Sequence, residues 1–224
     1  VSAHLLGWQE PVELAAALES RVQLPVVVEN DLIAMVSGLH WFGRGRSYES
    51  FAVLTVGAGV GIATVVDGRI VRGRHHMAGL TGRLPVGRGS DGDLIALREV
   101  ASTVAVVRRA REQGVLAPAG GIEELRDLVA AGDAGALAIA AELARALAAA
   151  AIGLVAMMDP EAIVLGGENV DLVRAAFGTF EETLRQGTAG GQQDLVVRTL
   201  SGDFDEWARG VAVISIQEFA GAAP

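Results

Sequence analysis

The 224-residue sequence contains no cysteine and no lysine. Without cysteine there is no disulfide framework, no thiol nucleophile and no cysteine-ligated zinc or iron–sulfur site. Without lysine there is no Schiff base and no lysine-containing phosphate loop. The 18 basic residues are all arginine and are outnumbered by 27 acidic residues, which gives a net charge of −9. Because a surface that binds DNA through its phosphates needs clustered positive charge, we do not expect this segment to contact DNA.

Long apolar runs and targeting segments are also scarce. The longest apolar stretch, residues 146–158, is shorter than the roughly 20 residues that a membrane-spanning helix needs. The first residues lack the basic segment and the apolar run of a secretory signal. We therefore expect a cytoplasmic protein without membrane contact. Since the chain starts at Val1 rather than at methionine, we also expect an N-terminal portion upstream of it.

With 51% hydrophobic and 20% charged residues, the chain can bury a sizeable core. Short apolar runs and the Asp67-Gly68 hairpin signal predict strands over 25–28, 51–56, 62–66, 69–71, 162–165 and 194–199. Helical periodicity predicts helices over 11–20, 31–40, 94–113, 122–131, 134–158, 170–185 and 206–219. Residues 72–93 are glycine-rich and are expected to form a long loop. The pattern indicates an α/β fold with a helical stretch in its middle.

The first candidate site is Glu29-Asn30-Asp31, directly after the predicted strand 25–28. Polar groups beyond the C-terminal end of a buried strand lie where α/β sheets usually bind ligands. Asp31 could act as a general base towards a hydroxyl, with Asn30 hydrogen-bonding neighbouring hydroxyls. The competing interpretation is a helix N-cap without any role in binding.

Two glycine-rich segments are further candidates. Closely spaced glycines after the strand 51–56 leave backbone N–H groups open that could hold a phosphate, although a plain hairpin has the same pattern. A glycine pair after the strand 162–165 allows a ligand to approach the backbone, and equally allows a tight turn. The candidate phosphate-binding residues are Thr55, Gly57, Gly59, Gly61, Gly166 and Gly167. Adjacent His75 and His76 point in different directions and make a poor metal pair.

In their order along the chain, these motifs resemble the ROK family (repressor, open reading frame, kinase). The resemblance covers nearly the whole chain and implies an actin/hexokinase-like ATPase fold, which is ribonuclease H-like: a mixed sheet flanked by helices. It rests on Gly7-Trp8, the segment 25–31, Trp41-Phe42-Gly43, the segment 55–61, Asp67-Gly68, Gly73, Ala78-Gly79, Ala101-Ser102, Asp159-Pro160-Glu161 with 163–167, and Ala208-Arg209-Gly210. Residues 1–224 would then be a sugar-binding and dimerisation domain, mainly the C-terminal lobe, with any winged helix-turn-helix and the first lobe's strands upstream.

The resemblance also implies roles for single residues. In family kinases the aspartate that matches Asp31 deprotonates the sugar hydroxyl, and Asn30 matches a sugar-binding asparagine. The glycine segment at 57–61 resembles the second phosphate loop. Gly166 and Gly167 resemble nucleotide-binding glycines, which would be vestigial in a protein that does not bind nucleotide.

Several positions depart from the family pattern. After Ala78-Gly79 the family has glutamate, a variable residue, glycine and histidine, whereas this chain has leucine at 80 and arginine at 83. The family glutamate binds sugar hydroxyls, and the histidine contacts sugar and often ligates zinc. Residues 86–97 lack the cysteines of the family's zinc loop, so we expect no metal. Arg83 is a candidate substrate-binding residue that could pair with Asp31, recruit an anionic sugar derivative or point to solvent.

Phosphoryl transfer needs two phosphate loops and a metal, and this chain supplies one such loop. The sequence therefore favours the effector-binding and dimerisation region of a sugar-responsive ROK-family transcriptional regulator. Such a protein is not catalytic, needs no cofactor, forms a homodimer and contacts DNA only through a domain absent from this chain. The alternatives are an ATP- and magnesium-dependent hexose kinase with Asp31 as general base, and a scaffold without a ligand.

Overall fold

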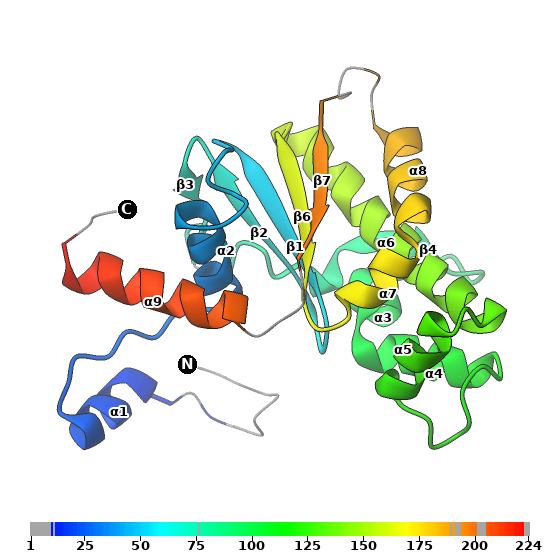
Figure 1. Ribbon diagram of the computed structural model, residues 1–224, viewed down its shortest axis with the longest axis horizontal. Helices are drawn as coiled ribbons and strands as arrows, with labels where there is room; N and C mark the ends of the chain where they lie inside the picture. Colours follow the sequence, from blue (N-terminus) through cyan, green and yellow to red (C-terminus); the bar gives the residue numbers. More distant parts are fainter. Residues whose placement is uncertain are drawn as a thin grey trace.

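The computed structural model describes residues 10, 12–75, 77–188, 190, 194–200 and 205–221. In this part of the chain, one mixed sheet contains five strands in the order β3-β2-β1-β6-β7, with helices on both faces (Figure 1). These strands are β1 (Phe51–Val56), β2 (Val60–Val66), β3 (Arg69–Ile70), β6 (Ala162–Gly166) and β7 (Val196–Thr199). The predicted mixed sheet flanked by helices is confirmed.

Strands β1, β2 and β3 form the predicted antiparallel meander. Thr55 pairs with Gly61 across the first turn, and Val66 pairs with Arg69 across the second. Asp67 and Gly68 both have positive φ, 51° and 71°, as a two-residue turn of this hand requires. On its other side β1 pairs in parallel with β6, which pairs in parallel with β7. The carboxyl ends of β1 and β6 therefore lie at one edge of the sheet.

One face of the sheet packs against α6 (Ala134–Met158), which begins at the N-cap Asp133. The Asp133 carboxylate accepts a hydrogen bond from the backbone N–H of Ala136 at 2.8 Å. Helix α6 is the one helix of the described residues long and apolar enough to cross a membrane, and 56% of its apolar window is buried inside the protein. The same layer contains α3 (Leu97–Ala101), α4 (Thr103–Glu112), α5 (Ile122–Ala130), α7 (Val170–Ala175) and α8 (Phe177–Gly187).

The opposite face packs against α2 (Asp31–Trp41), which crosses α9 (Asp205–Phe219) (Figure 1). The strand residues alternate as expected for a sheet covered on both sides: Ala52 and Leu54 join the α6 core, and Phe51 and Val53 join the α2 core. Helices α2 and α9 approach closely at a pair of glycines. A Cβ on Gly38 would lie 3.0 Å from the Gly210 Cα atom.

The segment 25–28 does not form the predicted strand. It follows α1 (Leu14–Val22), a helix without buried residues, and Val27 and Val28 are exposed. Apolar, β-branched residues form a strand only where a neighbouring strand accepts their hydrogen bonds, and the described sheet ends at β3 and β7 instead. The backbone N–H of Val26 donates to the Glu19 carboxylate at 3.0 Å.

Three further boundaries differ from the prediction. The predicted loop 72–93 contains the 3-10 helix η2 (Thr81–Arg83) and β4 (Pro85–Arg88), which pairs with β5 (Leu94–Ala96). The predicted helix 94–113 begins only at Leu97, because residues 94–96 form β5. It is then interrupted at Ser102, whose extended backbone (φ −72°, ψ 153°) and hydroxyl cap α4. The predicted helix 170–185 is divided at Ala176 into α7 and α8. Local hydrogen bonds that compete with a continuous helix, such as the Ser102 cap, leave no trace in hydrophobic periodicity.

Candidate functional site

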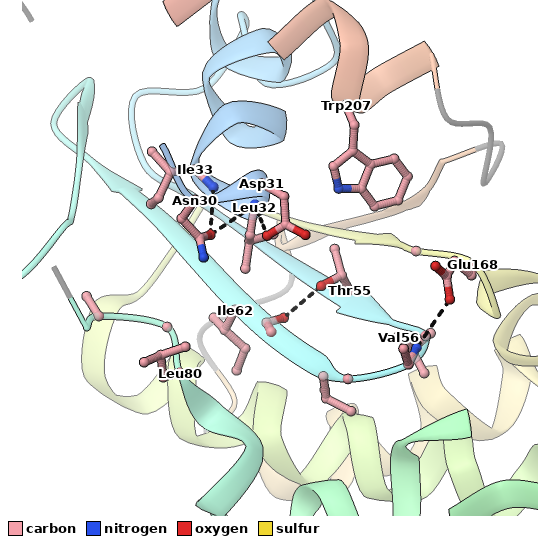
Figure 2. Close-up of a pocket in the computed structure, with 18 of the residues that line it drawn as sticks. Asn30, Asp31, Leu32, Ile33, Thr55, Val56, Ile62, Leu80, Glu168 and Trp207 are labelled. Carbon is pink, nitrogen blue, oxygen red and sulfur yellow. Dashed lines mark hydrogen bonds between the residues drawn. The ribbon is translucent and has the colours of Figure 1, made fainter. Parts of the chain in front are cut away.

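A cavity of about 460 Å³ lies at the edge of the sheet where β1 ends. Its walls are the start of α2, the turn of residues 57–61 between β1 and β2, the segment after β6, and Trp207 from α9 (Figure 2). We call residues 57–61 the glycine turn. Most of the residues singled out in the sequence are lining residues: Asn30, Asp31, Thr55, Gly57, Gly59, Gly61 and Gly167. This edge is where open α/β sheets bind ligands.

Asn30 is the N-cap of α2. Its side-chain oxygen accepts hydrogen bonds from the backbone N–H groups of Leu32 at 3.0 Å and Ile33 at 3.3 Å. The structural interpretation of Asn30 as a cap is therefore correct. It does not exclude a binding role, because the side-chain NH₂ group of an asparagine can donate to a ligand while the oxygen caps the helix.

Asp31 occupies the first position of α2. One carboxylate oxygen accepts from the backbone N–H of Leu32 at 2.8 Å. The side chain points into the cavity, toward the space between Thr55 and Trp207 (Figure 2). This short contact to its own helix fixes the carboxylate and leaves the second oxygen for a ligand hydroxyl. The geometry fits a hydrogen-bond acceptor or a general base.

The third member of the motif, Glu29, is neutralised by a partner. Its carboxylate lies 3.3 Å from the Arg72 Nε atom, and both side chains are partly buried. A second carboxylate oxygen accepts from the backbone N–H of Asn30 at 2.8 Å. This ion pair joins the segment before α2 to the segment after β3. Glu29 therefore shapes the wall of the cavity, and Asp31 contributes the negative charge on this side.

The glycine turn is shaped by close contacts. The backbone N–H of Gly57 donates to the Gly59 carbonyl at 2.9 Å, which closes the turn. A Cβ on Gly61 would lie 2.7 Å from the Leu32 side chain, whereas Gly59 has open space. Gly167 has φ +98°, and a Cβ there would lie 2.4 Å from the Val56 carbonyl oxygen. Packing of the turn therefore requires glycine at 167, where the neighbour is backbone, whereas the Leu32 side chain next to Gly61 can move.

Two candidate residues lie outside the lining. Gly166 ends β6, and a Cβ on it would meet the Leu200 side chain at 2.9 Å. Arg83 is exposed at the end of η2, and among the ion pairs of the described residues it has none with Asp31. Leu80, which stands where the family has glutamate, lines the cavity and is 64% exposed. The substrate-binding role of Arg83 stays a prediction.

Glu168 and Trp207 are among the lining residues that were not identified from the sequence. The Glu168 carboxylate accepts a hydrogen bond from the backbone N–H of Ala58 in the glycine turn at 3.2 Å. Trp207 presents its indole ring to the cavity from α9 (Figure 2). Trp207 is one of three tryptophans, and its place in an apolar helix gave no signal of a site. Glu168 follows a glycine pair, and its contact is 110 residues away in sequence.

Among the described residues, no group of three or more His, Asp or Glu side chains could hold a metal ion. His75 is exposed, and His76 lies outside the described residues. The described lining of the cavity contains three carboxylates, from Glu29, Asp31 and Glu168, and Glu29 is paired with Arg72. The described side chains therefore fit a hydroxyl-bearing ligand better than a tightly held zinc ion, which prefers imidazole or thiolate.

Comparison with known sequences gives consistent matches. Residues 1–213 match the sequence model of the ROK family. The bifunctional enzyme NanE/NanK of Brucella melitensis is 35% identical over 167 residues, which cover 72% of this chain and 31% of that protein. The glucokinase of Thermotoga maritima is 32% identical over 187 residues, which cover 76% of this chain and 59% of that protein. The chain thus spans less than two thirds of the length of these relatives.

Solved structures of the same family share the fold. A ROK family transcriptional regulator, a homolog of the E. coli MLC protein, has a TM-score of 0.78 at 25% identity, over 90% of this chain and 54% of that one. A ROK family glucokinase from Streptomyces griseus, in complex with glucose and AMPPNP, has a TM-score of 0.78 at 26% identity, over 90% and 71%. The actin/hexokinase-like fold inferred from the motifs is confirmed.

Proposed function

The chain belongs to the ROK family, and on that premise we propose that its cavity binds a sugar or sugar derivative through Asn30 and Asp31. The observation that carries the proposal is the position of these two side chains at the N-terminus of α2, facing the glycine turn across one cavity. Carboxylate and amide groups are the partners that sugar hydroxyls prefer. Sugar binding is also the step that a kinase and a sugar-responsive regulator share.

The indole ring of Trp207 supports a sugar as the ligand. A sugar has hydroxyl groups at its rim and apolar C–H faces, and a cavity that recognises it needs polar groups on one side and an apolar plane on another. Asp31 supplies an acceptor and Trp207 supplies the plane (Figure 2). The same cavity has a volume of about 460 Å³, which accommodates a monosaccharide.

Within the family we favour the effector-binding region of a regulator over a catalyst. Two features support this choice. Leu80 stands at the wall where the family's sugar-binding glutamate is expected, and Glu168 holds the backbone N–H of Ala58 in the turn that resembles a phosphate loop. Both features weaken kinase chemistry, and neither prevents a protein from responding to a sugar. A cytoplasmic location, a homodimer and contact with DNA through a separate domain belong to this proposal.

A sugar kinase is the second candidate, and the comparisons favour it at least as well. NanE/NanK and glucokinase are among the curated relatives, and a solved glucokinase matches as closely in fold as the regulator does. The place of Asp31 in the cavity lining supports a role as general base. In that case Asp31 would take the proton of the sugar hydroxyl, and ATP with magnesium would supply the phosphoryl group.

Calorimetric titration with neutral hexoses, sugar phosphates and sugar acids tests sugar binding. A hydrogen bond to a carboxylate contributes about 1.5–3 kcal/mol, so Asp31→Asn should weaken binding by roughly ten- to a hundredfold. Asp127→Asn is the matched control, because Asp127 is exposed on α5 and away from the cavity. An Asp31→Asn affinity equal to that of the wild type would contradict the proposal.

An ATP-coupled assay with the same hexoses separates the two candidates. A regulator without catalysis should bind sugar and give no turnover. Turnover that disappears in Asp31→Asn and persists in Asp127→Asn would establish the kinase instead.

A further inference from the structure

The Glu168 carboxylate lies on the glycine turn. One of its oxygens accepts from the backbone N–H of Ala58 at 3.2 Å and would lie 2.8 Å from a Cβ on Gly57. The N–H of Gly57 itself is directed to the Gly59 carbonyl. The Ala58 N–H therefore already donates to a carboxylate oxygen of the same chain, in the hydrogen bond that Figure 2 draws to Glu168.

The backbone under Glu168 is held in place. The N–H of Asn169 donates to the Val56 carbonyl at 3.0 Å, immediately before the glycine turn. The Arg126 guanidinium donates to the Glu168 carbonyl and, at 2.8 Å, to the side-chain oxygen of Asn169. Asn169 is 1% exposed. The segment that carries the carboxylate is thus fixed to the end of β1.

The turn is joined to the same network from its other side. The Asn169 side-chain NH₂ donates to the Thr103 hydroxyl at 2.8 Å, and the backbone N–H of Thr103 donates to the Gly57 carbonyl at 2.8 Å. Asn169 thus connects the glycine turn to the segment that carries Glu168. This connection holds the Glu168 carboxylate against the turn. A rotamer change of Glu168 alone would free the Ala58 N–H.

A phosphate that bound this turn would need the same donor. Its oxygens would take the place of the Glu168 carboxylate at 2.7–3.2 Å from the N–H, as hydrogen-bond geometry requires. Its negative charge would also face both Glu168 and Asp31. In the described part of the chain, neither of these carboxylates has an ion pair, because the one cation that lines the cavity, Arg72, is paired with Glu29.

We propose that Glu168 is a specificity-determining residue that occupies the anion position of the glycine turn, excludes nucleotide phosphates and leaves the cavity to a neutral, hydroxyl-bearing ligand. The inference rests on the proposed sugar-binding function. It predicts that one side chain excludes nucleotide phosphates from the glycine turn, and that removing this side chain is sufficient to admit them.

The test is calorimetric titration of the purified chain with magnesium-AMPPNP and, separately, with inorganic pyrophosphate. Glu168→Ala removes the side chain, and Glu168→Gln keeps its shape while removing its charge. Glu181→Ala is the control, because it removes the same charge from an exposed position on α8 away from the cavity. Thermal unfolding of all variants checks that each is folded.

We expect both Glu168 variants to bind magnesium-AMPPNP at least tenfold more tightly than the wild type, and Glu181→Ala to match the wild type. The inference would be overturned if both Glu168 variants bound magnesium-AMPPNP no more tightly than the wild type. It would also be overturned if neither the wild type nor any variant bound the nucleotide. Titration of the same proteins with neutral hexoses separates this failure from that of the proposed function. If the wild type and the Glu168 variants bind hexose, but the variants gain no affinity for nucleotide, the role of Glu168 is refuted and the proposed sugar binding is not.

Discussion

The crossing of α2 and α9 depends on Gly210, and the substitution Gly210→Ala tests it directly. A Cβ on Gly210 would lie 1.9 Å from the Ala34 carbonyl oxygen and 2.7 Å from the Met35 backbone nitrogen. Both atoms belong to the backbone of α2, so no side-chain rotation relieves the overlap. Since Cβ contacts under 3.0 Å are essentially absent from proteins, the backbones of the two helices must shift relative to each other to accommodate the alanine.

The expected cost follows from two opposing effects. Overpacking of a core contact costs about 1–3 kcal/mol, and a backbone contact that cannot relax belongs in the upper half of that range. Replacing glycine by alanine inside a helix gains up to about 1 kcal/mol. We therefore expect a net loss of about 1–2 kcal/mol in the free energy of unfolding. Full detachment of α9 would expose Val213 and Ile214 and cost more, at about 1.5–3 kcal/mol for each side chain.

Thermal unfolding followed by circular dichroism measures this loss, and tryptophan emission reports on α9 through Trp207. At about 2–4 °C per kcal/mol for a chain of this size, the midpoint should fall by about 2–8 °C. The matched control is Gly178→Ala in α8, where a Cβ has no neighbour within 4 Å and stability should be unchanged or higher. The contribution of Trp207 to the emission is the difference between a protein and its Trp207→Phe variant. If Gly210→Ala is as stable as Gly178→Ala, and this contribution is the same in Gly210→Ala as in the wild type, the close crossing of α2 and α9 is refuted.

Four further outcomes follow from single contacts. Asn169→Ala should lower the free energy of unfolding by about 1–3 kcal/mol in urea denaturation, because it leaves the Thr103 hydroxyl and Arg126 without their buried partner. Trp207→Ala should weaken hexose binding in calorimetry without changing the ligand preference, because it removes the apolar plane and no polar group. Leu80→Glu should strengthen hexose binding about tenfold or more by restoring a carboxylate acceptor. Arg83→Ala should lower the affinity for sugar phosphates and sugar acids if the guanidinium reaches the ligand, and equal affinities would end its assignment as a binding residue.

The sequence correctly predicted the elements that are specified by residues close together along the chain. The meander around Asp67-Gly68 was identified because a two-residue turn with positive φ needs these residues. The helix after Asp133 was identified because an N-cap preceded a long apolar periodicity. In both cases the information is local: the residues that specify the structure lie within one or two turns of each other.

The prediction was wrong where structure depends on partners remote in sequence. The run 25–28 has the composition of a buried strand, but composition does not state whether another strand is available to pair with it. In the hairpin of β4 and β5, the first strand was predicted as loop and the second as the start of the helix 94–113, because glycine and short strand length hide the pairing. Glu168 was not identified because its role consists of one contact with the N–H of Ala58.

The charge around the cavity explains why the choice of ligand class depends on so few residues. Glu29 and Arg72 neutralise each other, and Arg83 lies outside the lining, so among the described lining residues Asp31 and Glu168 determine the sign of the field. One carboxylate is useful to any protein that holds a sugar hydroxyl, whether or not it transfers a phosphoryl group. A second carboxylate on the glycine turn fits the proposed exclusion of phosphate, because a kinase would have to displace it in each cycle. The same α/β framework can therefore serve binding or catalysis, and the residue at position 168 is where the two requirements conflict.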